Sequence, residues 1–181
     1  MSKKKVYLPV VVLSLIAFMH VSCEETEEIG KYDNWQARNE AFIDSLQKVC
    51  DAELDPELLS VIDSRDKSQR IFYKKLVPVE EEGELSPYLT STVTVFYRGK
   101  LINEDVFDEN FTEDSPSQFD SPLSFTVGDV ISGWIEVLQR MKVGERWEVY
   151  VPWKSAYGTD GSGSIPGYST LIFDILLKGI E

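Results

Sequence analysis

The sequence predicts an α+β protein: an antiparallel, curved β-sheet wrapped around one short helix, with a helical arm on the N-terminal side. Segments typical of strands recur in the second half of the chain, at residues 71–77, 92–101, 123–127, 145–151 and 170–180. A single helical pattern falls among them, at residues 133–141. Strands and helices therefore do not alternate one by one, as they would in a parallel sheet. With 181 residues, 43% of them hydrophobic, the chain can bury the core of one domain.

The first residues have the pattern of a signal peptide. Lys3, Lys4 and Lys5 precede an apolar run at residues 6–19, which is too short to span a bilayer comfortably as a helix. The run ends at Ser22-Cys23, which resembles a bacterial lipoprotein cleavage site, although His20 stands where that site usually has leucine. We expect residues 1–22 to be a lipoprotein signal peptide. Cys23 would then carry the lipid that anchors the mature chain to a membrane.

The segment between the signal and the sheet is expected to be a tether followed by a helical arm. Residues 23–33 are acidic and contain few apolar groups, as a solvated tether does. Residues 34–69 form the expected arm, with an amphipathic helix at 34–52 and a second short helix at 56–62. Asp55 would cap the second helix and Pro56 would occupy its first position. The arm could pack on the domain that follows it or pair with a second copy.

Alternation and periodicity define the sheet and its helix. In residues 92–101, Val93, Val95 and Tyr97 share one face, as in a half-buried strand. In residues 133–141, an apolar stripe repeats at helical spacing, formed by Trp134, Val137, Leu138 and Met141. Gly144 follows the helix and is expected to end it in a left-handed conformation.

Composition excludes several classes of chemistry. The single histidine, His20, lies in the expected signal peptide, so the mature chain would have no imidazole for nucleophilic catalysis or zinc binding. The formal net charge of -13 argues against nucleic-acid binding, which depends on Lys and Arg. Asp108, Asn110 and Thr112 lack the glycine and glutamate that would complete a calcium loop. We expect neither a metal nor another cofactor.

Seven collinear segments carry a resemblance to a known family, from about Ile71 to Glu181. They are VTVFYRG (93–99), VFDEN (106–110), PLSFTVG (122–128), VISGW (130–134), MKVGERWEVYVP (141–152), SAYG (155–158) and IPGYSTLIFDILL (165–177). In order and spacing they resemble the FKBP-type peptidyl-prolyl cis-trans isomerases. The resemblance implies a half-barrel sheet around one helix over residues 70–181, which is the isomerase domain in this interpretation.

The resemblance also implies the residues of an active site. Those that would act directly on the substrate are Tyr97, Phe107, Asp108, Trp134, Tyr157 and Phe173. Those that would complete the substrate-binding wall are Leu123, Val130, Ile131 and Ile165. In this implied site the Ile131 N–H and the Tyr157 hydroxyl hold substrate carbonyls. The sequence departs from the family pattern by about six extra residues between Phe107 and Leu123.

The implied activity is isomerisation of Xaa-Pro bonds in exported polypeptides. The expected location is the bacterial envelope, lipid-anchored at the outer membrane on its periplasmic side or at the cell surface. The partners would be proline-containing polypeptides and the membrane, without nucleic acid, and the chain is expected to be a monomer. A binding or chaperone lipoprotein with weak turnover is one alternative. A lipocalin-type barrel is another, which a helix inside the sheet's concave face would exclude.

Overall fold

The computed structural model describes residues 30–79 and 85–181. The expected signal peptide with His20, the lipidation residue Cys23 and most of the acidic tether lie outside the described residues. Residues Tyr32–Glu181 form one compact unit by their internal contacts. Within the described ranges, no helix combines the length and apolar character needed to cross a membrane.

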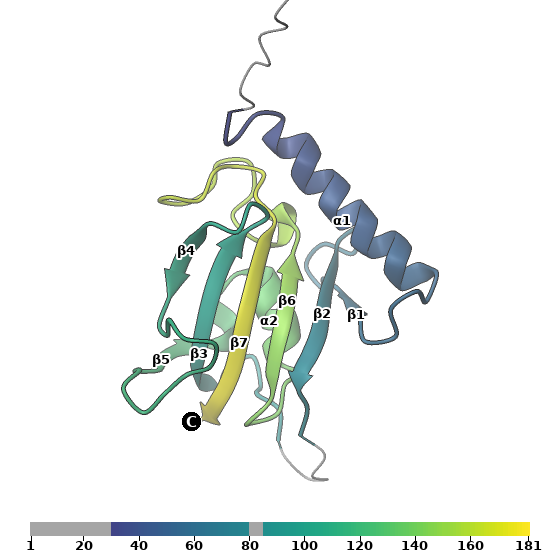
Figure 1. The fold of residues 1–181 in the computed structure, drawn as a ribbon. Helices are drawn as coiled ribbons and strands as arrows, with labels where there is room; N and C mark the ends of the chain where they lie inside the picture. The colour runs from purple at the N-terminus through teal and green to yellow at the C-terminus, as the bar shows by residue number, and fades with distance from the viewer. Residues whose placement is uncertain (1–29, 80–84) are drawn as a thin grey trace, which may run out of the picture. The chain divides into compact units, whose positions relative to one another are not determined.

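One antiparallel sheet contains every strand of the described chain (Figure 1). Its order is β1-β2-β6-β7-β3-β4, and β5 pairs separately with β3. The strands are β1 (Leu59–Ile62), β2 (Arg70–Val77), β3 (Thr92–Leu101), β4 (Val106–Glu109), β5 (Leu123–Thr126), β6 (Arg146–Val151) and β7 (Leu171–Ile180). The helices are α1 (Trp35–Asp51) and α2 (Ser132–Leu138), with short 3-10 turns η1 (Val127–Asp129) and η2 (Trp153–Ser155). The predicted α+β class and antiparallel sheet are confirmed.

The helix α2 packs against one face of this sheet and fills the core. All its residues from Gly133 to Leu138 are buried, and Trp134 and Leu138 join the buried residues of β3, β6 and β7 in one apolar cluster. Gly144 has the predicted left-handed conformation, with a φ of 93°, but it does not end the helix: α2 ends at Leu138, before the predicted Met141, and Gln139 is its C-cap. Because α2 occupies the space that a lipocalin barrel would leave hollow, the lipocalin alternative is excluded.

The second short helix predicted at residues 56–62 is wrong, because the chain forms a turn and a strand there. Asp55 closes the turn: its side chain accepts the Glu57 N–H at 3.0 Å and its carbonyl accepts the Leu58 N–H at 3.1 Å. Leu59–Ile62 then pairs with β2, from Leu59 opposite Tyr73 to Ile62 opposite Arg70. Without β1, the edge of β2 would have unpaired backbone N–H and C=O groups, and residues 59–62 form a strand because they pair with this edge. The pattern of residues 56–62 alone does not contain this information.

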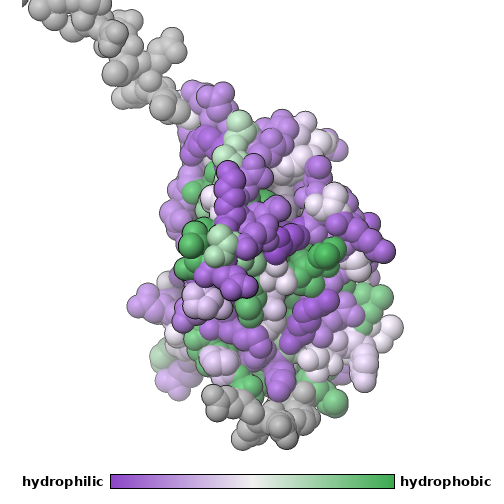
Figure 2. Space-filling model, turned by 90° about the vertical axis from the view of Figure 1, so that its right-hand side faces the viewer, coloured by the Kyte–Doolittle hydropathy of each residue, from purple (hydrophilic) through white to green (hydrophobic). Residues whose placement is uncertain are grey.

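The helix α1 is attached to its own domain near both of its ends. The Trp35 indole donates to Ser169 Oγ at 2.9 Å, and the side chain of the fully buried Asn39 accepts the Thr170 N–H at 2.7 Å. At the other end, Asp51 pairs with Arg70. Figure 2 shows that the face carrying α1 and β1 is mostly hydrophilic, with small scattered hydrophobic areas.

Candidate functional site

A pocket of about 290 Å³ opens on the face of the sheet that α2 covers. It is lined by Tyr97, Phe107, Asp108, Phe125, Asp129, Val130, Ile131, Trp134, Tyr157 and Phe173. The lining thus comes from β3, β4, β5 and β7, from α2 and the segment that leads into it, and from the segment after η2. Eight of the ten residues predicted for the site lie in this lining.

Leu123 and Ile165 are the two predicted residues that the structure does not bring to the pocket. Leu123 is 46% exposed on β5, and Ile165 is buried in the core. Phe125 lies in the lining instead, two residues after Leu123 on the same face of β5. Asp129, in η1, was also missed. Side chains two residues apart on a strand share one face, so the choice of Leu123 could also have identified Phe125 as a candidate. No local sequence pattern distinguishes Asp129.

The floor of the pocket consists of aromatic rings that meet edge to face. The Trp134 ring centroid lies 5.1 Å from that of Phe173, 5.4 Å from that of Tyr97 and 5.7 Å from that of Phe125. Phe107 contacts Phe173 in the same way, with centroids 5.6 Å apart. Such perpendicular contacts are favourable because the positive edge of one ring meets the negative face of another. The result is an apolar surface at the bottom of the pocket.

One polar atom is buried in this floor without a partner. The Trp134 indole Nε1–H has no hydrogen bond to any residue that the structure describes. The other indole nitrogens of the core differ in this respect: Trp35 Nε1 donates to Ser169, and Trp147 Nε1 donates to Glu145. An unpaired buried donor has a free-energy cost, which the packing of the aromatic rings around Trp134 must offset.

Two tyrosines and an aspartate supply the polar groups. The Tyr97 hydroxyl donates to Asp108 Oδ2 at 2.6 Å. Burial and the Asp108 carboxylate both raise the pKa of Tyr97 above its ordinary value, and burial followed by the Asp108 charge raises the pKa of Tyr157. Both hydroxyls therefore keep their protons at neutral pH and can act as hydrogen-bond donors.

Two donors remain available around the pocket. Within residues 30–79 and 85–181, neither the Tyr157 hydroxyl nor the Ile131 N–H makes a hydrogen bond. Tyr157 is 41% exposed, so its hydroxyl is accessible to a ligand. A group with two carbonyl oxygens next to an apolar ring matches this combination of donors and aromatic floor.

Local backbone features fix the position of Phe107 and Asp108. Asn110, just beyond β4, accepts the Tyr97 N–H at 2.8 Å and donates to the Val95 carbonyl at 3.1 Å. Opposite β4, Gly99 leaves room for the rings: a Cβ atom there would lie 2.4 Å from Phe107 and 2.9 Å from Phe173. Only glycine allows both rings to lie across β3 at this point.

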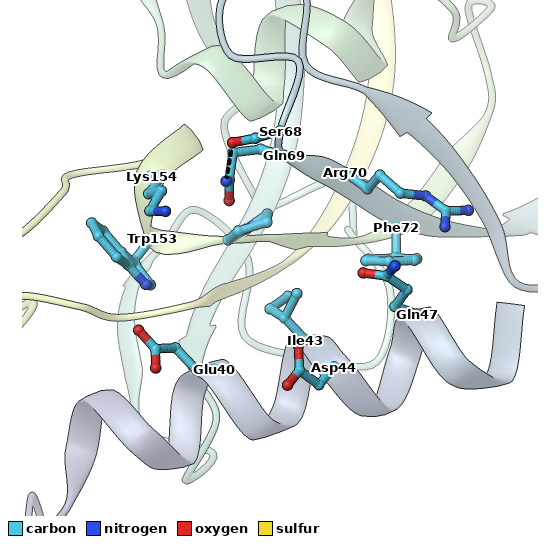
Figure 3. A pocket seen from close by; sticks show the side chains of 11 residues that line it. Glu40, Ile43, Asp44, Gln47, Ser68, Gln69, Arg70, Phe72, Trp153 and Lys154 are labelled. Atoms are coloured by element: carbon cyan, nitrogen blue, oxygen red, sulfur yellow. Dashed lines mark hydrogen bonds between the residues drawn. The ribbon is translucent and has the colours of Figure 1, made fainter. Parts of the chain in front are cut away.

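A second hollow of about 290 Å³ lies between α1 and the segments that begin β2 and follow β6 (Figure 3). Glu40 and Asp44 of α1 face it on one side, and Arg70 and Lys154 line it on the other. None of the residues predicted for the site belongs to it. Among the described residues, no group of three or more His, Cys, Asp or Glu side chains is arranged to hold a metal ion.

Comparisons with known proteins identify the family. Residues 83–178 match the model of the FKBP-type peptidyl-prolyl cis-trans isomerases. The FKBP-type 22 kDa peptidyl-prolyl cis-trans isomerase of Escherichia coli is 45% identical over 95 residues, which cover 52% of this chain and 43% of that protein. The outer membrane protein MIP of Legionella longbeachae is 43% identical over 96 residues, covering 52% and 39% respectively.

A solved structure extends this likeness to the fold. The crystal structure of FkpA from Escherichia coli aligns with a TM-score of 0.63 and 30% identity, covering 82% of this chain and 62% of that one. The chain spans less than half the length of the two curated relatives named above. The family match covers more than half of this chain and includes β3 to β6, most of β7, the helix α2 and every residue of the pocket lining, whereas β1 and β2 precede it. The chain therefore belongs to the family of FKBP-type peptidyl-prolyl cis-trans isomerases.

Proposed function

We propose that this chain is a peptidyl-prolyl cis-trans isomerase that binds the proline of an Xaa-Pro bond in the pocket above Trp134. The observation that carries the proposal is the combination of an aromatic floor with two available donors, the Tyr157 hydroxyl and the Ile131 N–H. Exported polypeptides are the proposed substrates, because their folding includes slow prolyl steps.

The chemistry requires no nucleophile and no metal. Rotation about the bond before proline has a barrier of about 18–20 kcal/mol, because amide resonance must be lost, but no covalent bond forms or breaks. The planar amide is more polar than the twisted transition state. Transfer from water into an apolar pocket therefore destabilises the planar form relative to the twisted form, which lowers the barrier.

Each lining group has a proposed role in this step. Trp134, Phe173 and Phe107 enclose the proline ring, and their contacts with one another hold them in place. The Tyr157 hydroxyl and the Ile131 N–H bind the carbonyls on either side of the rotating bond. The hydrogen bond from Tyr97 to Asp108 fixes the polar side of the pocket.

We also propose that Cys23 carries a lipid that anchors the protein in the bacterial envelope, at the outer membrane or the cell surface. Two observations support this: the leader pattern that ends at Cys23, and the relative whose name describes an outer membrane protein. Mass spectrometry of the mature N-terminus tests it. The expected mass includes acyl chains on Cys23, and Cys23→Ser should release the protein from membranes. An unmodified N-terminus, or unchanged membrane association of the variant, would contradict the anchor.

The activity is tested with a protease-coupled assay on a short Xaa-Pro peptide and the full-length chain. A cis-to-trans rate that rises in proportion to protein concentration is the expected result. A catalytically weak binding or chaperone lipoprotein would instead bind the peptide without accelerating its isomerisation. Measurement of both rate and affinity in the same samples therefore separates the two functions.

A further inference from the structure

A buried carboxylate outside the pocket connects two segments that line it. Asp63 lies in the turn between β1 and β2 and is only 1% exposed. Both of its carboxylate oxygens lie 2.6 Å from Ser132 Oγ, and Oδ2 also accepts the Ser155 hydroxyl at 2.6 Å. Hydroxyl donors on a carboxylate form short, strong hydrogen bonds, so Asp63 holds Ser132 and Ser155 firmly together.

The two serines that Asp63 binds lie next to the two proposed carbonyl-binding groups. Ser132 is the first residue of α2 and directly follows Ile131, whose N–H is a proposed donor. Ser155 ends η2 and lies two residues before Tyr157, whose hydroxyl is the other proposed donor. One carboxylate thus fixes the separation between the two segments that carry the carbonyl-binding groups.

The turn that carries Asp63 is itself held in place. Asp63 Oδ1 accepts the N–H groups of Arg65 and Asp66 at 2.8 and 3.4 Å. The Ser64 N–H donates to Glu136 Oε1 at 2.9 Å, and Glu136 is a buried residue of α2. The turn is therefore bound to α2 at Ser132 and again at Glu136, one helical turn later. Asp63 cannot shift without moving the start of α2.

We propose that Asp63 is a positioning residue for the isomerase site, which makes the segment before residue 70 part of the working enzyme. This inference rests on the proposed function. Burial of a charged group costs free energy unless the group is fully hydrogen-bonded. Asp63 accepts hydrogen bonds from Ser132 and Ser155, and these bonds join two segments of the site. Its loss would let Ile131 and Tyr157 move relative to each other and weaken their simultaneous contact with a substrate.

Asp63→Ala tests the inference in the full-length chain, with Glu145→Ala as the matched control. Glu145 is also 1% exposed and also accepts several hydrogen bonds, from Lys75, Lys142 and Trp147, but none of these partners lies within two residues of one that lines the pocket, as Ser132 and Ser155 do. Both variants remove a buried carboxylate, so both should lower the melting temperature. Only Asp63→Ala should lower kcat/KM, by about tenfold, when all proteins are measured where circular dichroism shows them folded.

A double-mutant cycle shows whether Asp63 acts through the two hydroxyls. In a Ser132→Ala, Ser155→Ala background, Asp63→Ala should cause little further loss of kcat/KM, because its partners in the site are already absent. Equal activity of Asp63→Ala and Glu145→Ala per folded molecule would overturn the inference, and so would losses that add independently.

NMR separates failure of this inference from failure of the proposed function. In the folded variants without substrate, Asp63→Ala should shift the Ile131 amide and Tyr157 ring resonances, and Glu145→Ala should leave both unchanged. If the unmodified protein catalyses no isomerisation, the proposed function fails, and these resonances still decide the positioning role. Unchanged resonances in Asp63→Ala would refute that role whatever the activity.

Discussion

Trp134 and Phe173 meet edge to face at the bottom of the pocket, with ring centroids 5.1 Å apart and planes inclined at 79°. Trp134 comes from α2 and Phe173 from the facing strand β7. The helix and the sheet therefore each supply one side of the same hollow. This contact connects the fold to the proposed function, because it forms the apolar surface on which the proline ring is proposed to lie.

Phe173→Leu should lower kcat/KM for an Xaa-Pro peptide by about tenfold, because it removes the aromatic side of the pocket while it keeps an apolar side chain. Phe173→Ala should lower it further. Phe111→Leu is the control: Phe111 is buried to a similar degree but lies under Arg98 and outside the pocket. Steady-state kinetics on the folded proteins provides the measurement. Equal activities of Phe173→Leu and Phe111→Leu would show that Phe173 has no role in the site.

Tyr157→Phe should lower kcat/KM by about 2- to 10-fold, which corresponds to the loss of one hydrogen bond to a substrate carbonyl. The melting temperature should change little, since the hydroxyl has no partner among the described residues. Tyr150→Phe is the matched control, because the Tyr150 hydroxyl donates to Glu148 and does not line the pocket. A loss of the same size in Tyr150→Phe would count against a specific role for Tyr157.

Gly133→Ala should destabilise the protein by about 1–3 kcal/mol, although alanine favours helix formation. A Cβ atom at Gly133 would lie 2.4 Å from Cγ1 of Val151, a fully buried and conformationally stiff side chain of β6. Urea unfolding gives the free energies. In a Val151→Ala background the cost of Gly133→Ala should become smaller, and strictly additive costs would contradict close packing of α2 on β6.

The contribution of Asp63 to stability should depend on pH. Burial raises the pKa of Asp63, but hydrogen bonds from Ser132, Ser155 and two backbone N–H groups outweigh it and hold the pKa below its ordinary value of 3.8. The carboxylate therefore stabilises the fold fully above pH 3.8, and this stabilisation is lost as the pH falls through the lowered value.

Asp63→Asn makes this dependence measurable by urea unfolding. At neutral pH it should cost about 1–3 kcal/mol, because a good acceptor is replaced by an amide. The difference from the unmodified protein should shrink below pH 3.8. A constant difference across this range would contradict a stabilising ionised Asp63.

The central strands and α2 could be predicted from the sequence because their patterns are local. The strict alternation around Val95 gave β3 its observed bounds, and the apolar stripe around Trp134 located α2. The edge strand β1 could not be predicted in this way, because it forms by pairing with β2. Its four residues have no hydrophobic alternation of their own that distinguishes a strand from a short helix.

The site could be predicted only through the family resemblance. An aromatic residue such as Trp134 or Phe173 would ordinarily be interpreted as part of the core, and both are in fact buried. Phe125 was missed because the resemblance assigned Leu123, two residues before it, to the substrate-binding wall. Asp63 was missed because its partners, Ser132 and Ser155, are 69 and 92 residues away in the sequence.

The most direct test of the account is NMR observation of the tryptophan indole N–H groups while a short Xaa-Pro peptide is added. The chain has four tryptophans, and the Trp134 indole is buried in the pocket without a hydrogen-bond partner among the described residues. The peptide should shift the Trp134 signal and give nuclear Overhauser effects between the proline ring and Trp134. Trp35 and Trp147, which bind Ser169 and Glu145, should stay unchanged, and an Xaa-Ala peptide should have no effect. Accelerated isomerisation of the peptide with no change at Trp134 would contradict the account.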